Sequence, residues 1–126
     1  MNEIKIVIPI NPTTKKNRQS IIKQGNKTYI IPSKEFQAYQ REAGWFITHK
    51  DELIDEPLEI ECRFYRSTER RVDLTNLLEA IDDILVHYKV IKDDYFKIIK
   101  SHDGSRVFID RANPRTEIVI RSFSGE

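Results

Sequence analysis

Acidic residues are concentrated in one part of the sequence, and their spacing suits metal-dependent chemistry. On a helical pattern of 100° per residue, Asp73 and Asp83 fall in an arc beside the apolar face. Glu79 lies just beyond that arc, and Asp82 points further away. No basic residue stands four positions on to relieve the repulsion. A divalent cation would relieve it, because Mg²⁺ and Mn²⁺ prefer hard oxygen ligands.

Each acid also has an ordinary structural interpretation. Asp73 suits the N-cap of a helix. Glu79 and Asp83 could belong to the solvated face of an amphipathic helix. Asp93 and Asp94, which could supply further ligands, form a common turn dipeptide. Taken singly, each acid fits the ordinary interpretation better, whereas the cluster as a whole favours a site.

Basic residues precede the acids in two groups. Because the net charge of the chain is only +1, contacts with an anionic partner such as nucleic acid must come from local clusters of cations of this kind. The candidates for these contacts are Lys15, Lys16, Arg18, Arg70 and Arg71. Each is equally explained as a solubilising surface residue. Further along the chain, Tyr95, Phe96 and His102 could stack on unpaired bases, although aromatic residues more commonly belong to the core.

The composition excludes several classes of protein. The chain has 126 residues and a net charge of +1, which suits one domain without an overall cationic field. No apolar run is long enough to cross a membrane, and the N-terminus lacks the core of a signal peptide. The single Cys62 excludes an internal disulfide and suits a reducing compartment. We expect one cytoplasmic domain, residues 1–126.

The elements that must position these residues follow from hydrophobic periodicity. Alternation predicts strands, and spacing of three and four predicts helices. Ser33 suits a helix cap, and Asp103-Gly104 suits a hairpin turn between two strands. The expected order is strand 4–8, loop 11–27, strand 28–31, helix 33–50, strand 58–65, helix 73–88, and strands 95–102, 106–109 and 116–121. This order predicts an α+β fold with a mixed sheet and two main helices.

Three segments together resemble the signature of RusA-type Holliday junction resolvases. They are the run from Arg70 to Leu77, the triplet Asp83-Ile84-Leu85, and the run from Val90 to Asp94. Pro12 and Asn17-Arg18 in the first loop, and Ser33 followed by Gln37-Ala38-Tyr39, are also similar to the family pattern. The resemblance covers residues 4 to 121, and the combined spacing is more specific than any one segment.

The resemblance implies a homodimer that resolves four-way DNA junctions by paired symmetric nicks with Mg²⁺. Asp73 matches the first Asp of the motif and Asp94 the second Asp of the later pair, so both are expected to bind the metal ion, with Asp93 beside them. Asp83 matches a further recurrent acid with a supporting catalytic role. The family's frequent encoding by prophages implies a bacterial or phage source.

Two positions depart from the family pattern. Thr75 stands where the motif has its second Asp, and Glu79 stands where it has a Lys. Because Glu79 lies one helical turn after Thr75, we hypothesise that its carboxylate replaces the missing one. Asn76 is expected to orient a ligand or the helix start. The departures keep two alternatives open: a branched-DNA-binding protein with weakened catalysis, and a non-catalytic interaction protein.

Overall fold

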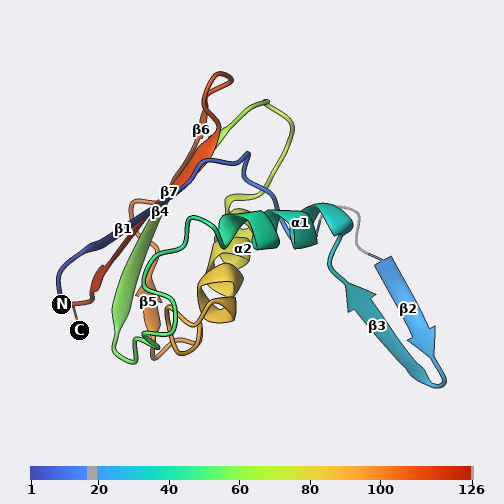
Figure 1. Ribbon diagram of the computed structural model, residues 1–126, viewed down its shortest axis with the longest axis horizontal. Helices are drawn as coiled ribbons and strands as arrows, with labels where there is room; N and C mark the ends of the chain where they lie inside the picture. The colour runs from blue at the N-terminus through green and yellow to red at the C-terminus, as the bar shows by residue number, and fades with distance from the viewer. Residues whose placement is uncertain (17–19, 126) are drawn as a thin grey trace.

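The computed structural model describes residues 1–16 and 20–125 and is built on a mixed sheet (Figure 1). The described elements are β1 Ile4–Ile8, β2 Ser20–Gln24, β3 Lys27–Ile31, α1 Lys34–Ala43, β4 Leu58–Arg66, α2 Leu74–His87, β5 Ile99–Ser101, β6 Arg106–Ile109 and β7 Arg115–Ser122. None of the helices in the described part is long and apolar enough to span a membrane.

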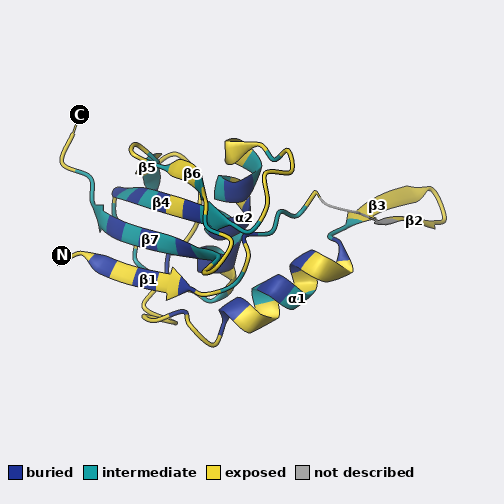
Figure 2. Ribbon diagram, turned by 90° about the horizontal axis from the view of Figure 1, so that it is seen from above, coloured by how far each residue is buried: buried dark blue, intermediate teal, exposed yellow. Residues whose placement is uncertain are grey.

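The main sheet has the order β1-β7-β4-β5, and β6 also pairs with β4. β7 is antiparallel to β1 and β4, whereas β5 and β6 are parallel to β4. Alternate residues of β1, β4 and β7 are buried on one face, and both helices cover that face (Figures 1 and 2). The α+β fold with a mixed sheet and two main helices is therefore confirmed.

The expected hairpin around Asp103-Gly104 is wrong. β5 and β6 do not pair with each other; each runs parallel to β4, β5 beside Leu58 and Glu59 and β6 beside its last four residues. After the turn the chain continues in the same direction along the edge of β4 and does not reverse. Gly104 lies in this turn at φ 88°. Within this turn the hydroxyl of Ser105 accepts a hydrogen bond from the Cys62 N–H at 2.9 Å.

The segment predicted as a loop from 11 to 27 contains strand β2, which pairs with β3 in a separate antiparallel hairpin. Gly25, at φ 60°, lies in its turn. This hairpin stands away from the rest of the molecule, beyond the N-terminal end of α1 (Figure 1). Its strand was missed because polar residues surround the pair Ile21 and Ile22, which alone shows no alternation.

The first helix begins as predicted and ends earlier. The hydroxyl of Ser33 accepts a hydrogen bond from the Phe36 N–H at 3.1 Å and caps α1. The helix ends at Ala43 instead of near residue 50, and the next residue is Gly44. A Cβ on Gly44 would lie 2.3 Å from the hydroxyl oxygen of Tyr88, which donates a 2.7 Å hydrogen bond to the Gln40 carbonyl. This contact joins α1 to the end of α2.

Candidate active site

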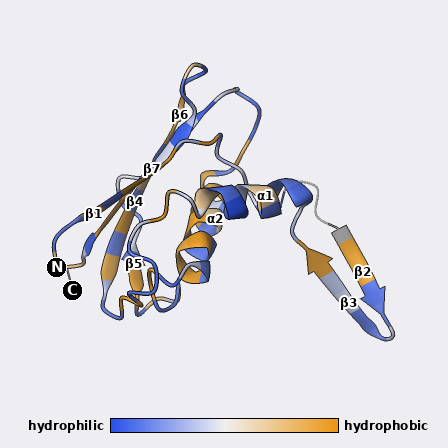
Figure 3. Ribbon diagram, viewed as in Figure 1, coloured by the Kyte–Doolittle hydropathy of each residue, from blue (hydrophilic) through white to orange (hydrophobic). Residues whose placement is uncertain are grey.

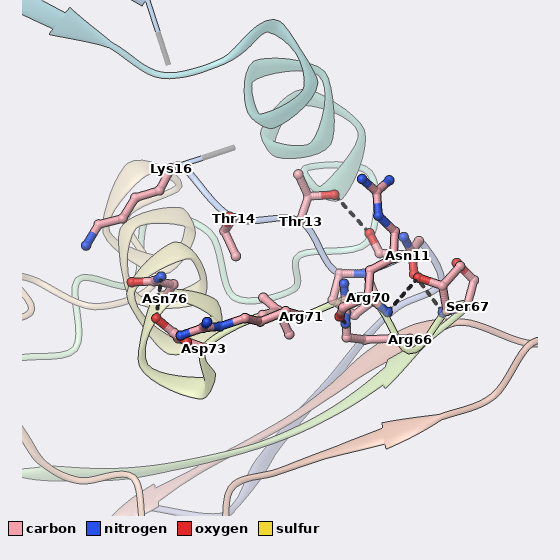
Figure 4. Close-up of a pocket in the computed structure, with 13 residues that line it drawn as sticks. Asn11, Thr13, Thr14, Lys16, Arg66, Ser67, Arg70, Arg71, Asp73 and Asn76 are labelled. Atoms are coloured by element: carbon pink, nitrogen blue, oxygen red, sulfur yellow. Dashed lines mark hydrogen bonds between the residues drawn. The ribbon is translucent and has the colours of Figure 1, made fainter. Parts of the chain in front are cut away.

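A basic pocket lies at the N-terminal end of α2 (Figure 4). Its volume is about 530 Å³, and the chain segments before α2 and after β1 form its wall. Four cations line it: Lys16, Arg66, Arg70 and Arg71. Hydroxyl groups come from Thr13, Thr14, Ser67 and Thr68. Cations and hydroxyl donors around one hollow suit a phosphate group.

Arg66 is the most enclosed of these cations. Its Nη1 donates a hydrogen bond to the Arg70 carbonyl, whereas its buried Nε has no partner among the described residues. Burial lowers the pKa of the Arg66 guanidinium, and the charge of Arg70 lowers it further. Two guanidinium groups that repel each other in a hollow favour an anionic ligand.

Asp73 occupies the N-cap position of α2 without using its carboxylate as a cap. Its backbone carbonyl accepts hydrogen bonds from the N–H groups of Asn76 and Leu77. The carboxylate instead accepts a 3.5 Å hydrogen bond from the side-chain amide of Asn76, and both side chains line the pocket (Figure 4). The prediction that Asp73 is the N-cap residue is therefore confirmed, although its side chain makes no cap hydrogen bond and contacts Asn76 instead.

A cluster of acids lies further along α2, around Lys15. The ammonium of Lys15 forms an ion pair with Asp83. The hydrogen bond that Lys15 donates to Asp83 raises the pKa of Lys15; burial lowers it, and the charges of Asp83, Glu79 and Asp94 raise it further. Lys15, predicted as a DNA contact, thus lies among the acids, whereas Lys16 faces the basic pocket. Sequence spacing alone gave no sign of a cation beside Asp83, because Lys15 comes from the distant first loop.

Asp82 belongs to this cluster, contrary to the expectation that it points away. Its Oδ2 lies 2.9 Å from His102 Nε2, and His102 Nδ1 lies 2.8 Å from the Ile60 carbonyl. The pKa of Asp82 is raised, chiefly by burial and further by the charges of Asp94 and Asp83, although the hydrogen bond and charge of His102 oppose this. The buried Oδ1 of Asp82 has no hydrogen-bond partner among the described residues. Helical-wheel reasoning missed Asp82 because its partner His102 follows β5, and only tertiary packing brings the two side chains together.

His102 is held between two acceptors. A carbonyl only accepts, so His102 Nδ1 donates to the Ile60 carbonyl. When Asp82 is ionised it also accepts, so Nε2 donates to it and the ring carries a proton on both nitrogens. Burial lowers the pKa of His102, but the hydrogen bond and charge of Asp82 outweigh burial, so the pKa of His102 is raised. The partner of His102 is Asp82 rather than the neighbouring Asp103.

Asp93 and Asp94 form a turn after α2. The Asp94 N–H donates a 2.7 Å hydrogen bond to Asp93 Oδ1. Burial raises the pKa of Asp94, and Asp93 and Asp83 raise it further. The next residues, Tyr95 and Phe96, are exposed by 48% and 70%. The expectation that these aromatic side chains belong to the core is therefore wrong, because the turn carries them into solvent.

The predicted acids thus fall into two groups on one helix. Asp73 and Asp83 are about 15 Å apart along the axis of α2, so one ion with ligands at about 2.1 Å cannot bind both. Among residues 1–16 and 20–125, no three Asp, Glu, His or Cys side chains are grouped as a metal centre. The donors nevertheless suit Mg²⁺, because they are carboxylate oxygens. Beside them, the buried Oδ1 of Asp82 has no hydrogen-bond partner in the described part of the chain.

The remaining predicted residues have simple positions. Arg70 and Arg71 are exposed and line the basic pocket. Thr75 and Glu79 are both exposed on α2, so the hypothesis that Glu79 replaces the missing acid stays a prediction. Arg18 lies outside the described residues.

Sequence comparison extends these observations. Residues 9–121 match the family described as Endodeoxyribonuclease RusA, and the match includes the basic pocket, the acid cluster and most of the sheet. No curated protein matches the chain in a corresponding comparison. Because the match covers nearly the whole sequence, the chain belongs to the RusA endodeoxyribonuclease family.

Proposed function

We propose that the protein is a Mg²⁺-dependent, structure-selective endonuclease that resolves four-way DNA junctions by paired symmetric nicks. The observation that carries this proposal is the position of a basic pocket and an acid cluster on the same helix, α2. The pocket suits a backbone phosphate and the acids suit a divalent cation. The setting is the cytoplasm of a bacterial or phage-infected cell, as the family resemblance implied.

DNA binding depends on the cations of the pocket. Arg66, Arg70, Arg71 and Lys16 bind backbone phosphates without reading sequence. Asn76 holds the Asp73 carboxylate at the edge of the same hollow. The exposed rings of Tyr95 and Phe96 lie directly after Asp94, where an unpaired base at the branch point can stack on them. The Lys100 ammonium lies 5.6 Å from the centre of the Phe96 ring and keeps this surface cationic.

Hydrolysis depends on the acid cluster. Asp83 and Asp94 would hold the ion, with Asp93 beside them, and Asp82 is kept in place by His102. A bound Mg²⁺ would supply a water of lowered pKa and neutralise charge on the phosphate. Lys15, which forms an ion pair with Asp83, would keep a positive charge beside the ion and the phosphate. Asp73 lies about 15 Å from Asp83 along α2, so it would hold a second ion and not share this one.

Paired nicking requires two sites related by a two-fold axis. A four-way junction is nearly two-fold symmetric, so a homodimer presents one site to each of two opposed strands. We therefore propose a homodimer, as the family resemblance implied. The alternative is a protein that binds junctions without cutting them. Thr75 favours this alternative, because it leaves the helix one carboxylate short of the family motif.

The proposal is tested with a labelled synthetic four-way junction and a matched linear duplex, each in Mg²⁺, Mn²⁺ or EDTA. We expect metal-dependent cleavage of the junction alone. Asp94→Asn and Asp73→Asn should each abolish cleavage while keeping junction binding, and the matched control Asp103→Asn, an exposed acid in a turn, should cut normally. Binding without cleavage by the unmodified protein would establish the non-catalytic alternative.

A further inference from the structure

The segment that follows β1, residues 11–16, contacts the polar side of α2, and we call it the strap. Lys16 of the strap lines the basic pocket beside Asn76 (Figure 4). Lys15, directly before it, instead forms an ion pair with Asp83. Two consecutive lysines therefore reach two different parts of the same helix.

Both contacts are on one side of α2. Asn76, Glu79 and Asp83 follow one another at intervals of three and four residues, so their side chains share a side of the helix. The larger buried residues, among them Ile81 and Leu85, lie on another side, and Figure 3 shows both hydrophilic and hydrophobic positions along α2. Asn76 and Asp83 are about 10 Å apart along the axis, so Lys15 lies about two turns beyond the pocket.

Negative charge exceeds positive charge around Lys15. The charges of Asp83, Glu79 and Asp94 all act on its ammonium. Among the described residues, no other lysine or arginine forms an ion pair with these three acids. One ammonium and three carboxylates leave two negative charges uncompensated, which is the charge that one divalent cation would neutralise.

The carboxylate of Asp83 has one oxygen for each of two cations. Its Oδ2, which faces the Lys15 ammonium, is shielded from solvent. The Asp83 side chain is nevertheless 28% exposed, so this exposure comes from its other atoms, which include Oδ1. Asp83 can therefore hold Lys15 through the buried oxygen and a metal ion through the accessible one.

Two neighbouring cations are the arrangement that cleaves phosphodiesters in two-ion sites. Such sites place their ions about 3.5–4 Å apart, so that both neutralise the same phosphate. An ion at Asp73 would be about 15 Å from Asp83 and could not act on that phosphate. The ammonium of Lys15 is already beside Asp83, where the second positive charge is required.

We propose that Lys15 is a catalytic residue: its ammonium is the second cation of the hydrolytic centre, shares Asp83 with a single divalent ion and contacts the scissile phosphate. The inference deepens the proposed function and rests on it. In the reaction a water oxygen bonds to phosphorus and gives up a proton to solvent, while the bond from phosphorus to one sugar oxygen breaks and that oxygen takes up a proton from solvent. Lys15 transfers no proton; its charge offsets the negative charge that builds on the phosphate in the transition state.

The first test measures Mn²⁺ binding to the full chain without DNA, by isothermal titration calorimetry. Asp83→Asn should abolish the binding event at the acid cluster and so identifies it. Lys15→Gln removes a positive charge beside the ion and should tighten that event at least about tenfold. Lys15→Arg keeps the charge and should leave the affinity nearly unchanged. The matched control is Lys5→Gln, an exposed cation on the face of the sheet away from the helices, which should bind Mn²⁺ as the unmodified protein does.

The second test measures single-turnover cleavage of a four-way junction at saturating Mn²⁺. Lys15→Gln should cut roughly a hundredfold to a thousandfold more slowly, whereas Lys15→Arg should keep most of the rate and Lys5→Gln all of it. Tighter metal binding together with slower cleavage is the signature of a second cation. A misfolded variant would lose both properties, and a merely solubilising lysine would change neither.

The outcomes separate this inference from the proposed function. If the unmodified protein binds Mn²⁺ and cuts, an unchanged Mn²⁺ affinity or an unchanged cleavage rate in Lys15→Gln would overturn the role of Lys15 alone. Equal losses of cleavage in Lys15→Gln and Lys15→Arg would also overturn it, because the charge would then not be the property that matters. An unmodified protein that does not cut would overturn the proposed function and this inference together.

Discussion

The basic pocket predicts a specific salt dependence of junction binding. Four cations line it: Lys16, Arg66, Arg70 and Arg71. If each neutralises one phosphate, the slope of log affinity against log salt is about −3.6 per protomer. Raising salt from about 50 to about 200 mM should then weaken binding roughly 150-fold per protomer. Arg70→Gln/Arg71→Gln removes two of these contacts and should make the slope shallower by about 1.8 per protomer.

The measurement is fluorescence anisotropy of a labelled junction in EDTA, so that no strand is cut. Lys5→Gln is the matched control, because Lys5 is an exposed cation on the face of the sheet away from the helices. It should leave the slope unchanged. An unchanged slope for the double variant, or an equal loss in the control, would refute the assignment of the pocket to phosphate.

Three further predictions concern stability. Gly44→Ala should lower the free energy of unfolding by about 2–4 kcal/mol in urea titration, because its Cβ displaces Tyr88 and breaks the hydrogen bond to Gln40; an unchanged value would contradict this. Burial and neighbouring acids raise the pKa of Asp94, so its protonated form favours folding and that benefit is lost as pH rises. Asp94→Asn should therefore raise the melting temperature of the metal-free protein at about pH 7 but not at about pH 3, and a lower melting temperature would contradict this. Arg115 lowers the pKa of Asp110, so the ionised Asp110 carboxylate stabilises the fold above the ordinary Asp pKa of about 3.9, and this stabilisation is lost as pH falls. Asp110→Asn should therefore lower the melting temperature at about pH 7 but not at about pH 2, and an equal loss at both would contradict this.

Periodicity predicted the elements that pack against the core. β1, β4 and β7 alternate buried and more exposed residues, and α2 has an apolar stripe, so burial leaves a direct pattern in the sequence. Pairing leaves no such pattern. The two short strands β5 and β6 look like a hairpin because Asp103-Gly104 suits a turn, yet both pair with β4. α2 returns the chain to the start of β4, so β5 runs parallel to β4, and the turn after β5 continues in the same direction into β6; local residues do not encode these connections.

The site was partly predictable for the same reason. The acids of α2 share a helix, so their spacing indicated that Asp73 and Asp83 lie in one arc with Glu79 just beyond it. Lys15 and His102 reach the cluster from distant segments, and only tertiary packing places them against Asp83 and Asp82. The basic pocket likewise combines residues around Asn11 with residues around Arg66, and their sequence separation gives no sign that they share one hollow.

The most direct test of the account is cleavage of a supercoiled plasmid that extrudes a cruciform. Two symmetric nicks made while the protein stays bound give linear plasmid, whereas a single nick gives a relaxed circle. We predict linear plasmid in Mg²⁺, no product in EDTA, and none with Asp94→Asn in either condition. Relaxed circles as the only product would contradict paired nicking by a dimer, and an intact plasmid in Mg²⁺ would contradict the proposed nuclease activity.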